Sequence, residues 1–142
     1  MRRSLFSIFI LAAVTGLSLS AGAETPPPPP YFETAKAVLM QGKAAEAFVL
    51  LEPQEGARAG EIPFDLLLGI AAIDAGQHTR AVFALERVLA VQPNNARARA
   101  EIARAYLALG EAETARQEFE TVQRQGVPAD VSLTLDRYIA AA

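Results

Sequence analysis

The sequence predicts an all-α domain: a right-handed stack of about three helical hairpins, closed by a C-terminal capping helix. Two observations carry this prediction, a repeat with a period of 34 residues and two apolar helical stripes within each period. The period is marked by Gly42, Gly76 and Gly110, and an alanine follows each glycine by five residues. A repeat of this length is one supersecondary unit that buries its apolar face only against its neighbours, so a stack is expected.

Residues 1–23 have the composition of a signal peptide. Arg2 and Arg3 give a basic start, residues 5–19 are mostly apolar, and a small-x-small pattern ends at Ala23. A membrane anchor is the alternative, but about 15 apolar residues are short against the roughly 20 that span a bilayer. We therefore predict cleavage after Ala23 and a periplasmic or secreted mature chain. General secretion is favoured over twin-arginine export, although the arginine pair fits both.

Composition excludes several classes of protein. The chain has no cysteine, which excludes disulfides, thiolate metal sites and an N-terminal lipid on cysteine. Loss of residues 1–23 would leave 11 basic and 16 acidic residues, for a net charge near −5. This balance argues against a nucleic acid partner, because phosphates require a basic face. Contact with a membrane is expected only through the signal peptide or through an envelope partner.

Residues 24–30 are expected to form a linker. They include five consecutive prolines, residues 26–30. Such a run favours an extended polyproline II rod of about 3 Å per residue, which gives a semi-rigid spacer of roughly 15 Å. The alternative is a proline-rich ligand for another domain.

The hairpin units are expected at about residues 31–61, 62–95 and 96–128, with the capping helix at 129–141. In the second unit, apolar residues follow helical spacing from Phe64 until Gly76 ends the helix. A second apolar stripe begins near Thr79, and Pro93 cannot continue it.

The third unit repeats this pattern, with helices at Ala96–Leu109 and Glu113–Arg124 on either side of Gly110. Asp130 is then placed to begin a capping helix over Val131–Ala140. Such a helix would close the exposed end of the stack.

The first unit is the least regular. Helices are expected at Tyr31–Gln41 and Ala44–Leu51, where the small and apolar positions of the repeat are kept. Pro53 should end the second helix early, and an acidic loop is expected at Gln54–Glu61.

The packing residues of the second and third units resemble those of the tetratricopeptide repeat family. They are Leu68, Gly69, Ala72, Gly76, Ala81, Leu85, Val88 and Pro93 in the second unit, and Ile102, Ala103, Tyr106, Gly110, Ala115, Phe119 and Val122 in the third. This resemblance implies a domain whose function is to bind a protein or peptide.

Four segments are also similar to a narrower family. They are residues 67–72, 84–89, 103–110 and 137–141. These segments resemble the repeat region that precedes the outer-membrane β-barrel in the surface lipoprotein assembly modifier family of Gram-negative bacteria. The resemblance implies a periplasmic domain. The sequence to residue 142 has no alternating strand pattern, so only the soluble half of such a protein is expected.

Candidate catalytic groups are few. After residue 23 there is one histidine, His78, and one serine, Ser132, and they lie in different units. Neighbouring carboxylates two residues apart point to different sides of a helix. These pairs are Glu111 with Glu113 and Glu118 with Glu120. The glycines recur at helix breaks without the lysine and hydroxyl of a phosphate loop. We therefore predict no enzyme, no cofactor, no metal and no small-molecule substrate.

The predicted binding site is the concave groove lined by the first helices of the units. Its residues are expected to be Phe32, Lys36, Leu39, Met40, Leu66, Ile70, Ile73, Asp74, Arg97, Arg104 and Leu107. This surface is apolar with an arginine edge, which suits a segment with hydrophobic anchors and nearby carboxylates. Alternatively, Leu66 and Ile70 are covered by the linker or by a second copy in a homodimer.

The sequence therefore favours an exported interaction module, a scaffold or adaptor in cell-envelope assembly or secretion. A self-associating structural subunit, or the periplasmic half of a surface lipoprotein exporter, is the alternative. A hydrolase is a distant third.

Overall fold

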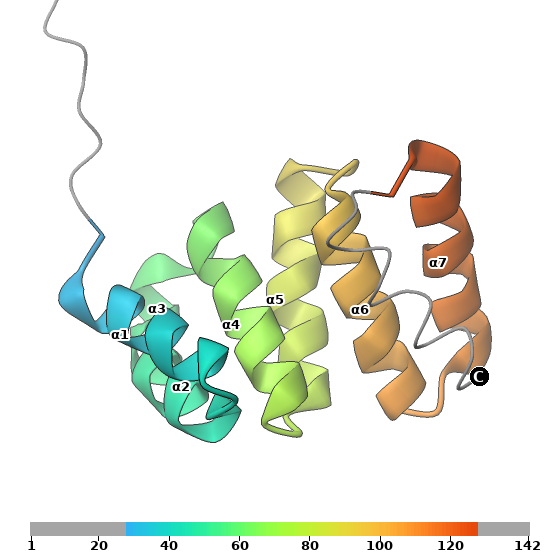
Figure 1. Cartoon of the computed structure of the whole chain (residues 1–142). Coiled ribbons are helices and arrows are strands. Elements are labelled where there is room, and N and C mark those ends of the chain that lie inside the picture. Colours follow the sequence, from blue (N-terminus) through green and yellow to red (C-terminus); the bar gives the residue numbers. More distant parts are fainter. Residues whose placement is uncertain (1–27, 128–142) are drawn as a thin grey trace, which may run out of the picture.

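The computed structural model describes residues 28–127, and within them all regular structure is helical. The helices form three antiparallel hairpins (Figure 1). These are α1 (Pro30–Met40) with α2 (Ala44–Leu51), α4 (Ile62–Asp74) with α5 (His78–Val91), and α6 (Ala96–Ala108) with α7 (Ala112–Gln125). The predicted all-α stack of hairpins is confirmed. The predicted signal peptide, the capping helix and most of the linker lie outside the described residues.

The turn of each hairpin depends on a glycine with a positive φ. Gly76 has a φ of 78°, and Gly42 and Gly110 take similar values of 78° and 82°. The amide of Gly76 donates to the carbonyl of Ile73 at 3.0 Å, and the amide of Gln77 donates to that of Ala72 at 2.7 Å. These bonds satisfy the last carbonyls of α4 and reverse the chain, as the spacing of the glycines predicts.

The prediction of a loop at Gln54–Glu61 is wrong in part, because much of this segment is helical. A 3-10 helix, η1 (Glu52–Gln54), continues directly from α2, and the short α3 (Glu55–Arg58) follows it. Pro53 lies in the first turn of η1. The α-helix α2 ends at Leu51, as expected from Pro53. An amide is not required for hydrogen bonding in a first helical turn, so the proline can begin η1 directly after it.

Two arginines of α5 attach this extension to the second unit. Arg80 forms ion pairs with Glu52 and, at 2.6 Å, with Glu55. Arg87 reaches Glu55 at 3.0 Å and Asp65 at 2.6 Å. Asp65 is fully buried at the start of α4, and its other carboxylate oxygen accepts a 2.7 Å bond from the amide of Gly60. The buried carboxylate is thus neutralised and hydrogen-bonded, as burial of a charge requires.

The core runs through the stack and depends on close packing of each first helix. The apolar core reaches from α1 to α6, and its fully buried side chains include Leu51, Leu85 and Val88. Gly69 of α4 lies against Leu85 of α5, where a Cβ atom would be 2.6 Å from the Leu85 Cγ. A smaller cluster around Phe119 joins α6 to α7.

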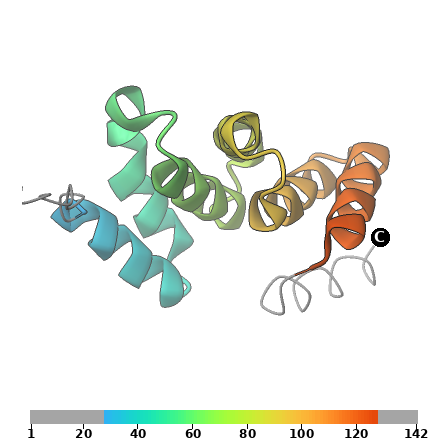
Figure 2. The same cartoon turned by 90° about the horizontal axis from the view of Figure 1, so that it is seen from above.

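The first helices α1, α4 and α6 follow one another along the inner side of an arc, with α5 on its outer side (Figure 2). Among residues 28–127, no helix has both the length and the apolar content needed to cross a membrane. The predicted binding residues belong to the three first helices.

Substitution of Gly69 by alanine should destabilise the protein by about 1–3 kcal/mol, because the added Cβ overpacks a closed core. Urea unfolding measures the change. Gly56→Ala is the matched control, since a Cβ atom added at Gly56 on α3 would meet nothing within 4 Å. Equal loss of stability in both variants would contradict the close approach of α4 and α5.

The pH dependence of stability should report the ion pairs of Glu55. Burial raises the pKa of Glu55, but the hydrogen bonds and charges of Arg80 and Arg87 outweigh this effect and hold the pKa below its usual range. The stabilisation is therefore complete above the unfolded pKa and is lost as pH falls through the folded value. Urea titrations from about pH 6 to about pH 3 should show a smaller loss in Glu55→Gln than in the wild type. Parallel curves for the two proteins would refute this role of Glu55.

Candidate protein-binding surface

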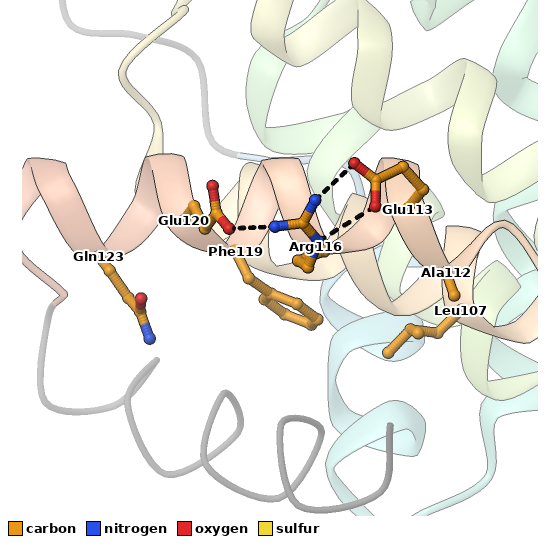
Figure 3. Close-up of a pocket in the computed structure, with 7 residues that line it drawn as sticks. All are labelled: Leu107, Ala112, Glu113, Arg116, Phe119, Glu120 and Gln123. Atoms are coloured by element: carbon orange, nitrogen blue, oxygen red, sulfur yellow. Dashed lines mark hydrogen bonds and ion pairs between the residues drawn. The ribbon is translucent and has the colours of Figure 1, made fainter.

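The eleven predicted groove residues all lie on the first helices α1, α4 and α6. The repeat places them at equivalent positions, so Phe32 corresponds to Leu66, and Lys36 to Ile70 and Arg104. The helices that carry them follow one another on the inner side of the arc (Figure 2). Leu107 departs from the predicted groove, since it lines a cavity with Phe119 and Gln123 of α7 (Figure 3), and the other predicted residues differ in how far they are exposed.

The apolar members of the predicted groove are most accessible on α1. Met40 is 83% exposed at the end of α1. Phe32, Leu39 and Leu66 are half-buried and pack against the edge of the core. Ile70 is also half-buried. We call these five residues the α1–α4 patch.

The structure does not leave Ile73 available to a partner. Its side chain is only 6% exposed and belongs to the main core cluster. Helical spacing places Ile73 on the side of α4 that the sequence assigned to the groove, but α6 packs against α4 and fills this space. The assignment of Ile73 is therefore corrected from groove to core.

The two arginines predicted at the edge of the groove, Arg97 and Arg104, form ion pairs with carboxylates of the same chain. Arg97 donates through Nε to Glu101 at 2.7 Å, and Arg104 donates through Nη1 to the same carboxylate at 2.6 Å. Arg104 also reaches Asp74 of α4 through Nη2 at 2.5 Å. Glu101 is fully buried. The arginines thus neutralise a buried carboxylate, and the expected basic edge is replaced by a neutral cluster.

The electrostatic surroundings of Arg104 keep its guanidinium group charged. Burial lowers the pKa of Arg104, but the charge of Glu101 and the hydrogen bonds to Asp74 and Glu101 outweigh it, so the pKa lies above its ordinary value. Arg104 therefore stays protonated at all accessible pH values. Its bond to Asp74 also joins α6 to α4. Sequence reasoning missed Glu101, although its spacing of four from Arg97 and three from Arg104 is that of helical ion pairs.

The remaining chemical candidates are dispersed. His78 begins α5 beside a shallow cavity of about 160 Å³, whereas Ser132 lies outside the described residues. Glu118 pairs with Arg99 at 2.6 Å, and Glu113 pairs with Arg116 at 2.6 Å. In the part of the chain that the structure describes, no group of three potential metal ligands comes together.

Comparison with known proteins agrees with the geometry. Residues 72–133, from within α4 to beyond α7, match the tetratricopeptide repeat family. No curated protein matches the chain at a significant level. The fold is therefore an all-α, tetratricopeptide-like stack, and repeats of this family are non-catalytic modules that generally mediate protein–protein interaction. The narrower resemblance to surface lipoprotein assembly modifiers stays a prediction.

Replacement of Glu101 by alanine should destabilise the protein by about 3–5 kcal/mol, because it removes one partner of a buried ion pair. Urea unfolding measures the loss. Glu120→Ala is the matched control, since Glu120 pairs with Arg116 on the exposed face of α7. Such surface pairs contribute about 0–1 kcal/mol. Similar effects of the two substitutions would contradict the central role of Glu101.

Proposed function

We propose that the chain is an exported interaction module that holds a protein or peptide segment against the α1–α4 patch. In this proposal it acts as a scaffold or adaptor in cell-envelope assembly or secretion. The observation that supports the proposal is the exposure of apolar side chains, Met40 above all, on the first helices α1 and α4.

The chemistry of the patch favours an apolar partner segment. Met40 is flexible and polarisable, and such a side chain adapts to varied apolar surfaces. Lys36 is the one basic residue predicted on this part of α1. Its Nζ lies 3.9 Å from the Oε2 of Glu33, and both side chains are exposed. Hydrophobic anchors at helical or extended spacing would therefore supply most of the binding free energy.

The neutral cluster on α6 changes the partner expected from the sequence alone. Arg97 and Arg104 are bonded to Glu101 and Asp74, so a partner carboxylate would compete with existing ion pairs. Breaking a buried pair is costly. We therefore expect partner carboxylates to contribute little, and apolar residues to decide recognition.

In-cell photocrosslinking tests the patch directly. A photoreactive residue at position 40 should crosslink to a partner, and Met40→Glu with Ile70→Glu should abolish crosslinking elsewhere on the patch while helicity is kept. Val49→Glu with Phe83→Glu is the matched control, since these residues are 65% and 57% exposed on the second helices α2 and α5. If the control pair abolished capture and the patch pair did not, the surface would be wrongly assigned. Crosslinks to a second copy would instead favour self-association.

Export is tested by the mass of the mature protein. Cleavage after Ala23 predicts that the chain recovered from the periplasm or medium begins at Glu24. Intact mass spectrometry after cell fractionation measures this. An uncleaved chain in the cytosolic fraction would refute the envelope role. It would not bear on the α1–α4 patch, which the crosslinking experiment tests.

A further inference from the structure

We propose that Met40 is a site of reversible oxidation, through which a peroxide lowers the affinity of the α1–α4 patch for its partner. The inference rests on the proposed function, because it names a regulation of the same surface. Met40 is the last residue of α1 and is 83% exposed. The sequence has two methionines and no cysteine, and the other methionine, Met1, lies in the predicted signal peptide. Met40 therefore carries the one readily oxidised sulfur of the predicted mature chain.

The position of Met40 allows oxidation to change the surface without changing the fold. Val38 and Leu39 pack against the main core cluster, whereas Met40 is exposed at the end of the same helix. The chain turns directly after it, at Gly42 with a φ of 78°. Oxidation of a buried methionine disrupts a core, but a sulfoxide at Met40 would remain in water. The helices should therefore stay folded when Met40 is oxidised.

The repeat shows why polarity matters at this position. Met40 lies one period before Asp74, and Ile70 lies one period before Arg104. Between α4 and α6, Oδ1 of Asp74 accepts a 2.5 Å bond from Nη2 of Arg104. The corresponding residues of α1 and α4 are Met40 and Ile70, which are apolar members of the patch. A sulfoxide oxygen at Met40 would therefore lack the donor that Asp74 has in the next unit.

The oxidation transfers one oxygen atom from the peroxide to the thioether of Met40. A lone pair of Sδ attacks a peroxide oxygen, the S–O bond forms as the O–O bond breaks, and the second oxygen of hydrogen peroxide leaves as water with both protons. Sulfur loses two electrons and the peroxide gains them. Methionine sulfoxide reductases reverse the step with a dithiol, which becomes a disulfide while the oxygen leaves as water. Burial of the polar sulfoxide against an apolar partner costs free energy that burial of the thioether does not.

In-cell photocrosslinking before and after hydrogen peroxide tests the proposal in the full chain. A photoreactive residue at position 36, one turn before Met40 on α1, leaves the sulfur in place. Crosslinking to the partner should fall on the order of tenfold after peroxide and recover once the peroxide is removed. The matched control combines Met40→Leu with Val49→Met, which moves the sulfur to a position 65% exposed on α2. Its ratio of crosslinking after to before peroxide should stay near one, whatever its starting level.

Peptide mass spectrometry and urea unfolding of the same proteins separate the possible outcomes. Unchanged crosslinking of a chain whose Met40 is oxidised, or a Met40 that resists peroxide, would overturn the regulation and leave the proposed function standing. An equal fall in the control variant would also overturn it, because the loss would not need the sulfur of Met40. A lower urea midpoint after oxidation would show an effect on the fold and contradict the inference. Absence of crosslinks before peroxide would refute the proposed function and the regulation together.

Discussion

Close approach of two helices within each hairpin is the constraint on which the stack depends. It requires a small residue where the first helix crosses the second, and the chain supplies Ala35, Gly69 and Ala103 at equivalent positions. Each is buried, and the space beside Gly69 is too small for one more carbon. Because the two helices of each hairpin lie close together, the first helix of the next unit can contact both of them. The helix α4 packs against α1 and α2, and α6 packs against α4 and α5. The arc and its inner face follow from this packing.

Two buried carboxylates, Asp65 and Glu101, belong to ion-pair clusters that connect neighbouring units of the stack. Asp65 is held by Arg87 and the amide of Gly60, and Glu101 is held by Arg97 and Arg104. Each cluster joins elements that are separate in sequence, α3 to α5 in one case and α4 to α6 in the other. Since loss of one partner of a buried ion pair is costly, these clusters favour one arrangement of the stack. The Glu101 cluster also neutralises the two arginines of α6.

The hairpins could be predicted from the sequence because their signals are local. A glycine such as Gly76 and a stripe of apolar residues mark where a helix ends and which side it buries. The extension through Pro53 was missed because proline both ends helices and begins them. The groove was less predictable, since the side of α4 that carries Ile73 is covered by a neighbouring unit. The partners of Arg104 likewise depend on Asp74, thirty residues earlier in the chain.

The proposed recognition surface is short and apolar. It would be formed by α1 and α4 and bordered by the ion cluster of Glu101 on α6. A hydrogen-exchange footprint of the crosslinked complex tests this most directly. The account predicts added protection at residues 32–40 and 62–74, with none at residues 78–91 on the outer side of the arc. Protection confined to residues 78–91 would contradict it.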